Sequence, residues 1–173
     1  DLFNGHDASG WTGPGGVAAA DSWQVTGTTF SATRKTTLWS EEMFGDCELE
    51  IEWKVEPGGN GGVFYLVNGA SELSSPEMQL TDPASAGATQ SGGLYRLEPP
   101  KQDASKPVGE WNDAVVVVNG NQITYSINGQ VTTEMIDNSP KALKDGVIGF
   151  QMHGGHTMTL QFKDIKIKML DKP

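Results

Sequence analysis

The sequence of 173 residues predicts an all-β fold: one domain built as a two-sheet antiparallel sandwich or jelly roll. Three observations support this prediction. Short runs rich in β-branched and aromatic residues recur along the chain, clusters of Gly, Pro, Asn and Asp separate them, and no segment keeps a helical period over several turns. The length is sufficient for one core without metal or disulfide crosslinks.

The expected strands follow one another with turn residues between them. They are DSWQVTGTTFSAT, CELEIEWKV, GGVFYLV, PEMQLT, AVVVVNGNQITYSINGQVTTEMI, GVIGFQMH and MTLQFKDIKIKML. Residues 115–135 predict a three-stranded meander, because turns at 119–121 and 128–129 use residues that tolerate positive φ. In the last run the alternation of apolar and polar residues changes phase near Asp164. Residues 139–144 allow one helical turn at most, and 83–93 and 99–109 predict surface loops.

The net charge, the lengths of the apolar runs and the cysteine count argue against nucleic-acid binding, a transmembrane helix and an internal disulfide. The formal net charge of -10 disfavours binding to nucleic acid or to an anionic membrane surface. No apolar run approaches the ~20 residues that a transmembrane helix needs. The single cysteine, Cys47, has no partner for an internal disulfide and is expected to be a buried, unreactive thiol.

The stretch 76–82, PEMQLTD, places a carboxylate and an amide away from the expected core. Side chains alternate on a strand, so Glu77 and Gln79 project to one face while Met78 and Leu80 project to the other. Most wetted sheet faces carry Lys, Thr and Ser instead. The pattern therefore indicates a candidate site on the polar face.

Residues 150–153 repeat this arrangement. Gln151 and His153 share one face of the expected strand, and Phe150 and Met152 share the other. Two such strands side by side would form a polar floor of amides and titratable groups. His153 is accordingly a candidate general base or hydrogen-bonding residue.

Metal binding and direct glycoside hydrolysis are two alternative functions for these residues. His153 and His156 would suit a metal if their loop curled back, although no nearby carboxylate completes a set, and a simple Gly-Gly turn explains the spacing equally. Glu77 and Asp82 are five residues apart, which sends them to opposite faces unless a bulge intervenes. Asp82 has the alternative role of capping the turn into Pro83.

Aromatic residues offer candidate sugar contacts. Most tryptophans of a β-sandwich belong to its core, but Trp111 lies beside the Pro-rich loop and is the one expected to reach a groove. Tyr95 and Arg96 follow the Gly-Gly turn at 92–93 and could line the same groove. Arg96 has pairing with surface acids as an equal alternative.

Seven segments, in order, resemble the bacterial 3-keto-disaccharide hydrolase family, long a domain of unknown function. They are LFNGHDASGW, WSEEMFGDCELEIEWKVEPGGNGGVFYLV, PEMQLTD, SGGLYRLEPP, KPVGEWN, the INGQ turn, and GVIGFQMHGG with FKDIKIKML, and they span Leu2 to Leu170. The resemblance implies a concanavalin A-like lectin/glucanase jelly roll. It also implies a periplasmic or secreted protein, in some members lipid-anchored, and hence a leader that this sequence does not contain.

The resemblance further implies a sugar substrate that carries a ketone at C3. That ketone acidifies the hydrogen on C2, so a base can remove it, the C1 substituent can leave, and water can then add. Such a route needs a base, an electrophile for the enolate oxygen and an acid for the leaving group, and a divalent cation could be the electrophile.

The site residues that the resemblance implies come from three motifs. The family's E-x-Q strand falls on Glu77 and Gln79, its G-E-W-N on 109–112, and its Q-x-H-G on 151–154. Glu77 or His153 would be the base or a metal ligand. The residues expected to bind or orient the sugar are Asn60, Gln79, Asp82, Tyr95, Arg96, Trp111, Asn112 and Gln151. The sequence departs from the family at Gly61, Val67 and Tyr125, where Ser, Arg and His are frequent.

The alternative from another class is a non-catalytic carbohydrate-binding module on the same fold, which needs aromatics and amides but no proton-transfer group. A conventional glycosidase is a third hypothesis, and it predicts turnover of glycosides that have not been oxidised.

Overall fold

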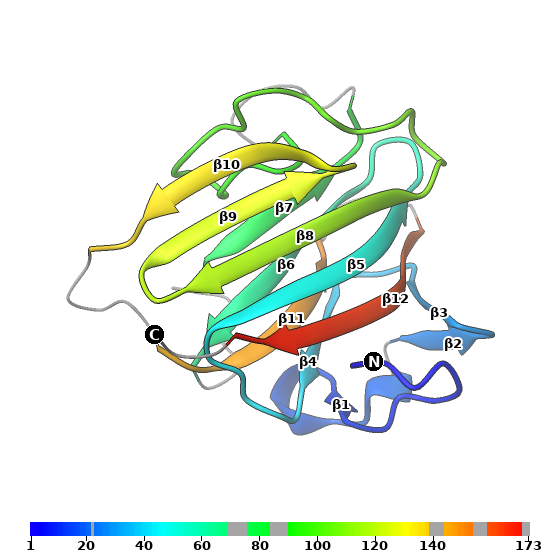
Figure 1. Ribbon diagram of the computed structural model, residues 1–173. Coiled ribbons are helices and arrows are strands. Elements are labelled where there is room, and N and C mark those ends of the chain that lie inside the picture. Colours follow the sequence, from blue (N-terminus) through cyan, green and yellow to red (C-terminus); the bar gives the residue numbers. More distant parts are fainter. Residues whose placement is uncertain (22, 69–75, 84–89, 139–143, 154–158, 171–173) are drawn as a thin grey trace.

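The computed structural model describes residues 1–21, 23–68, 76–83, 90–138, 144–153 and 159–170, which form two antiparallel sheets packed face to face (Figure 1). The smaller sheet has the strand order β1-β4-β11-β6-β7, and the larger has the order β10-β9-β8-β5-β12-β3-β2. The all-β, two-sheet antiparallel jelly-roll prediction is confirmed. No helix in the described part of the chain has the length and apolar character needed to cross a membrane.

The smaller sheet consists of β1 (Trp11–Thr12), β4 (Thr36–Ser40), β6 (Asn60–Val67), β7 (Glu77–Thr81) and β11 (Val147–Met152). The larger sheet consists of β2 (Gln24–Thr26), β3 (Thr29–Ala32), β5 (Cys47–Val55), β8 (Asn112–Asn119), β9 (Gln122–Ile127), β10 (Gln130–Ile136) and β12 (Leu160–Met169). Two short 3-10 helices, η1 (Pro14–Gly16) and η2 (Ala19–Asp21), lie between β1 and β2.

Turn residues occur where the sequence placed them. The meander is β8-β9-β10, and Gly120, Asn128 and Gly129 in its turns adopt positive φ of 61°, 49° and 76°. The phase change in β12 falls at Asp164, which has φ 48° and lies in a register shift against β5. The helical turn expected at 139–144 lies largely outside the described residues.

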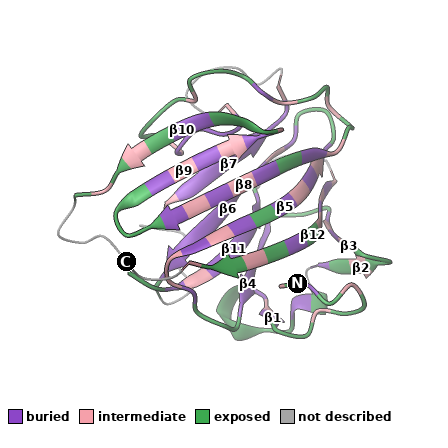
Figure 2. Cartoon of the chain, viewed as in Figure 1, coloured by how far each residue is buried: buried purple, intermediate pink, exposed green. Residues whose placement is uncertain are grey.

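The sequence did not predict the two-residue strand β1 or the strand β4, TTLWS, which is the longer of the two. All five of its residues are buried, so it shows no alternation of polar and apolar side chains that would mark a strand. By contrast, β5 and β8 alternate between buried and more exposed residues, as Figure 2 shows.

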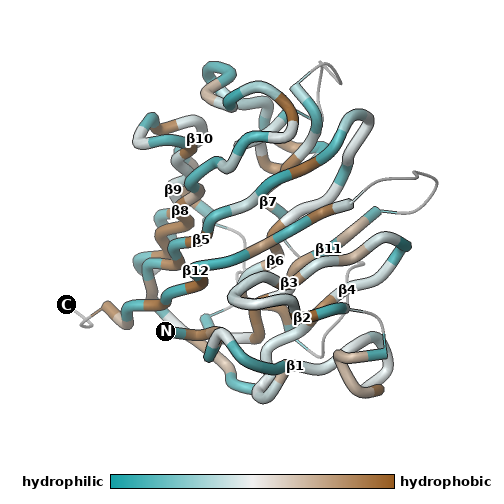
Figure 3. Tube along the Cα trace, turned by 90° about the vertical axis from the view of Figure 1, so that its right-hand side faces the viewer, coloured by the Kyte–Doolittle hydropathy of each residue, from teal (hydrophilic) through white to brown (hydrophobic). Residues whose placement is uncertain are grey.

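The core lies between the two sheets, which Figure 3 shows edge-on as two layers. Phe150 of β11 and Phe162 of β12 meet across it with ring centroids 4.6 Å apart. The hydroxyls of Tyr65 on β6 and Tyr125 on β9 are hydrogen-bonded at 2.5 Å. Burial raises the pKa of both phenols, so both remain protonated and the pair is a neutral link between the sheets.

Cys47 is buried in β5, as the sequence predicted. Burial raises the pKa of its thiol to about 11, and the nearby Asp46 carboxylate adds to the rise. Because the thiolate is the reactive form, this thiol is poorly suited to chemistry at neutral pH.

The tyrosine pair makes a prediction about stability. Tyr125→Phe leaves the Tyr65 hydroxyl buried without this partner, and we expect the free energy of unfolding in urea to fall by about 1–3 kcal/mol. The double variant Tyr65→Phe/Tyr125→Phe removes both polar groups and should lose less than the sum of the two single variants. Strictly additive losses would show that the hydroxyls do not interact.

Candidate active site

The polar residues of β7 lie on the outer face of the smaller sheet. Met78 and Leu80 point into the core, so Glu77 and Gln79 point away from it, as alternation predicted. They are nevertheless almost inaccessible: Glu77 is 6% exposed and Gln79 is 1% exposed. This face is therefore not an ordinary wetted surface, on which both side chains would be open to solvent.

The polar residues of β11 share that outer face. Phe150 and Met152 belong to the core, which places Gln151 on the opposite side of the strand, where it is 7% exposed. The backbone N–H of His153 donates to the carbonyl oxygen of Asn60 at 2.9 Å and extends the ladder by one residue beyond β11. His153 is exposed at this end of the face.

The two polar strands are not side by side, because β6 separates them. This corrects the sequence-based picture of adjacent strands. The register places Gly62 of β6 directly opposite Gln79 of β7 on one side and directly opposite Gln151 of β11 on the other. The middle position between the two glutamines thus has no side chain.

The side chain of Glu77 occupies the space above Gly62. A Cβ atom added to Gly62 would lie 2.2 Å from Glu77 Oε1 and 2.7 Å from Glu77 Cγ, far inside contact distance. A glycine in a strand interior commonly marks such a close approach. The Glu77 carboxylate therefore reaches across β6 toward β11.

His153 is the diagonal neighbour of Gly62 across the ladder, since Gly62 is paired with Gln151. Diagonal positions on antiparallel strands are separated by about 7–8 Å. The Glu77 carboxylate over Gly62 and the residue His153 therefore occupy diagonal positions on the same outer face. The arrangement offers a proton acceptor, a second titratable group and amides on one surface.

Asn60 and Gln79 are tied together at the same face. Gln79 Nε2 donates to Asn60 Oδ1 at 2.6 Å and to the Gly61 carbonyl oxygen at 3.0 Å. Both amide hydrogens are used, which fixes the orientation of the Gln79 amide. Its role in this structure is to hold Asn60 and to present its own carbonyl oxygen.

An apolar cluster adjoins the polar group on the outer face. Trp39, Phe64 and Val67 are buried together, and the rings of Trp39 and Phe64 are stacked with centroids 5.5 Å apart. Phe64 is paired with Glu77, so the apolar cluster and the polar residues of the outer face are neighbours at this position. Val67, where the family often has Arg, is part of this cluster.

The backbone of Tyr95 lies beside that of Glu77, and Arg96 follows it. The Tyr95 N–H donates to the Glu77 carbonyl oxygen at 3.0 Å along the edge of β7. Arg96 has φ 61° and places its guanidinium carbon 4.9 Å from the centroid of the Tyr95 ring.

Asp82 is held by the turn before β6. Its Oδ2 accepts a hydrogen bond from the Gly58 N–H at 2.7 Å. The pairing of β7 with β6 contains no register shift, so no bulge brings Asp82 onto the face of Glu77. Asp82 thus caps the turn at Gly58, whereas the sequence suggested a cap of the turn into Pro83, and the register does not support a paired-carboxylate role.

Trp111 and Asn112 are not brought together with Glu77. The ring of Trp111 lies 4.9 Å from Lys54 Nζ and 4.6 Å from Lys163 Nζ, and both lysines project from the outer face of the larger sheet. Asn112 is 3% exposed, and its Oδ1 accepts hydrogen bonds from Lys106 N at 2.7 Å and Asn128 Nδ2 at 2.9 Å. The GEWN motif therefore organises a loop on the other side of the core.

Two of the departures from the family do not alter the face that carries Glu77. A Cβ at Gly61 would point into the core, 2.6 Å from Leu160 Cδ2. Tyr125 is also internal, bonded to Tyr65.

Among the residues that the structure describes, no three His, Cys, Asp or Glu side chains are grouped as metal ligands would be. His156, the other half of the suggested metal pair, lies outside the described residues.

Sequence reasoning missed Gly62, the residue that brings the site together. Gly62 ends the run GGNGG at 58–62, where glycines are also typical of a turn. The signal that could have identified it is a glycine within a strand, on the same face as the predicted polar residues.

Comparison with known proteins places the chain in a family. Residues 1–168 match the 3-keto-alpha-glucoside-1,2-lyase-like domain. The 3-keto-disaccharide hydrolase of Bacteroides thetaiotaomicron is 25% identical to this chain in an alignment that is 228 residues long with its gaps. The alignment covers 98% of this chain and 78% of that protein.

Two solved structures share the fold. A candidate glycosyl hydrolase from Parabacteroides distasonis has a TM-score of 0.85 at 24% identity, covering 98% of this chain and 93% of its own. A Bacillus subtilis protein of unknown function with a galectin-like fold has a TM-score of 0.70 at 15% identity, with coverage of 99% and 94%. Both support the lectin/glucanase type of jelly roll. Since the family match spans nearly the whole sequence, the chain belongs to the 3-keto-alpha-glucoside-1,2-lyase-like family, which confirms the resemblance to the 3-keto-disaccharide hydrolases.

Proposed function

We propose that this protein is a carbohydrate-active enzyme that cleaves 3-keto-glycosides, including 3-keto-disaccharides, by elimination followed by hydration. The observation that carries the proposal is the Glu77 carboxylate over Gly62, between Gln79 and Gln151 and diagonal to His153. The family and the Bacteroides relative support a substrate of this class.

In the elimination step, Glu77 accepts the proton from C2 of the sugar. The electrons of that C–H bond form a C1=C2 double bond conjugated with the C3 ketone, and the C1–O bond breaks. His153 protonates the departing oxygen. Donors such as the Gln151 amide stabilise the negative charge that develops on the C3 oxygen.

In the hydration step, water adds to C1 and a proton returns to C2, which yields the free 3-keto sugar. No oxocarbenium ion and no enzyme nucleophile are required, so one carboxylate is enough. A divalent cation at the C3 oxygen would supply the same electrophilic assistance, with Glu77 or His153 as ligand.

Glu77→Gln should abolish proton abstraction while keeping the shape of the side chain. With 3-keto nitrophenyl glucoside we expect kcat to fall by about 10²–10⁴ and sugar binding to persist. Nitrophenol release from this substrate and from unoxidised nitrophenyl glucoside, with and without a chelator, provides the measurement. Glu50→Gln, an exposed position on the other sheet, is the matched control.

An unchanged rate in Glu77→Gln would contradict the role of this carboxylate. Sugar binding without turnover by the wild-type protein would favour the binding module. Release of nitrophenol from the unoxidised glucoside would favour a conventional glycosidase.

His153→Asn should affect poor leaving groups more than good ones, because only poor leaving groups need protonation as they depart. We expect a loss of about tenfold or more with a 3-keto-disaccharide and a smaller loss with the 3-keto nitrophenyl glucoside. Equal losses on both substrates would show that His153 does not protonate the leaving oxygen.

Gly62→Ala should displace the Glu77 carboxylate, because the added methyl group would lie 2.2 Å from Oε1. We expect kcat on 3-keto nitrophenyl glucoside to fall at least about tenfold. Gly45→Ala is the control, since its methyl group would meet only the Lys144 carbonyl oxygen at 3.4 Å. Full activity of Gly62→Ala would refute the proposed path of Glu77 across β6.

A further inference from the structure

The segment 91–95 lies along β7, the edge strand of the smaller sheet, beside the site. It pairs with β7 through three backbone hydrogen bonds: Gln79 N to Gly93 O at 3.0 Å, Gly92 N to Gln79 O at 2.9 Å, and Tyr95 N to Glu77 O at 3.0 Å. The backbone of both proposed site residues on β7 is thus fixed on one side by this segment.

The other side of the segment is held by β10, the edge strand of the larger sheet. The pairing of β10 with β9 shifts register between Val131 and Thr133, so Thr132 is an extra residue. The bulge buries two consecutive side chains: Thr132 is 0% exposed and Thr133 is 1% exposed.

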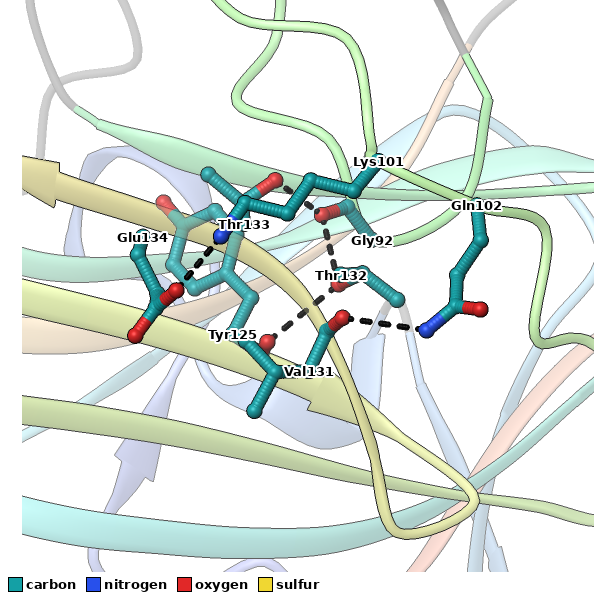
Figure 4. Close-up of polar contacts among 8 residues, drawn as sticks. All are labelled: Gly92, Lys101, Gln102, Tyr125, Val131, Thr132, Thr133 and Glu134. Atoms are coloured by element: carbon teal, nitrogen blue, oxygen red, sulfur yellow. Dashed lines mark hydrogen bonds and ion pairs between the residues drawn. The ribbon is translucent and has the colours of Figure 1, made fainter.

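Both threonine hydroxyls donate to one acceptor, the Gly92 carbonyl oxygen (Figure 4). The distances are 2.8 Å from Thr132 Oγ1 and 2.7 Å from Thr133 Oγ1. Gly92 has φ 80°, and a Cβ there would lie 2.5 Å from Thr132 Oγ1, so no larger residue fits. The contact thus joins two buried hydroxyl donors to one carbonyl acceptor.

The chain that follows the segment closes over the same bulge. Lys101 N donates to the Thr132 carbonyl oxygen at 2.7 Å, and Lys101 Nζ pairs with Glu134 Oε2 at 2.5 Å. The stretch from Gly92 to Lys101 therefore starts and ends against β10, with Tyr95 and Arg96 between the two attachments.

We propose that Thr132 and Thr133 are positioning residues: they hold Gly92 so that the 91–95 segment keeps Tyr95 in line with Glu77. This inference rests on the proposed function for its effect on catalysis. Under the proposed function Tyr95 would contact the sugar, whereas the Glu77 side chain lies over Gly62 of β6. Loosening the segment should therefore weaken substrate binding more than it slows the chemical step.

Thr133→Val tests the proposal, since it keeps the shape of the side chain and removes one donor while Thr132 still bonds Gly92. Amide hydrogen exchange and steady-state kinetics on 3-keto nitrophenyl glucoside are compared in the same variants. Thr133→Ser retains the hydroxyl and should restore the wild-type values. Thr124→Val, on the outer face of β9, is the matched control.

For Thr133→Val we expect exchange of the Gln79 and Tyr95 amides to accelerate about tenfold, with core strands such as β5 unaffected. KM should rise about three- to tenfold and kcat should change less than twofold. Exchange that accelerates uniformly, or a KM that stays at the wild-type value despite local loosening, would overturn the proposal.

Failure of the proposed function would look different from failure of this inference. A wild-type protein that is inactive on the 3-keto substrate would refute the function. In that case Kd for 3-keto glucose replaces KM as the second readout, and an unchanged Kd in Thr133→Val would overturn the positioning role.

Discussion

The absence of a side chain at one strand position governs the candidate site. β6 lies between the two strands that carry the polar residues, and any side chain at Gly62 would keep Glu77 away from β11. With glycine there, the Glu77 carboxylate from β7 lies over the neighbouring strand β6, on the side toward β11. Proton abstraction next to a carbonyl depends on such placement, because a general base must lie within hydrogen-bonding distance of the proton it removes.

Contacts on the core side of the smaller sheet hold β6 and β11, and thereby the position of the Glu77 carboxylate. On the core side of the same strands, Phe150 packs on Phe162 and Tyr65 is bonded to Tyr125, so β6 and β11 are tied to the larger sheet at the level of the site. On the outer side, the stacked Trp39 and Phe64 fill the space next to Glu77. A carboxylate confined between an apolar cluster and a row of amides has few alternative orientations, which is the preorganisation that electrostatic catalysis requires.

The sequence was sufficient for properties that depend on local pattern and insufficient for those that depend on strand order. Alternation alone assigned Glu77 and Gln79 to one face, and Asn128–Gly129 marked a hairpin turn. It could not reveal that β6 separates β7 from β11, because that pairing joins residues far apart in the chain. It missed β4 because burial on both faces removes the alternation, and it could not assign Trp111 to a side of the sandwich because Trp111 precedes its strand.

The most direct measurement of the central claim follows the hydrogen on C2. If Glu77 removes it, cleavage of a 3-keto-glycoside in D₂O should release a keto sugar with one deuterium at C2, as detected by NMR under single-turnover conditions. Free 3-keto glucose incubated with the enzyme corrects for later exchange. Incorporation that depends on Glu77 is the predicted result. Cleavage with the original hydrogen retained on C2, and with no kinetic isotope effect from deuterium at C2 of the substrate, would contradict the account.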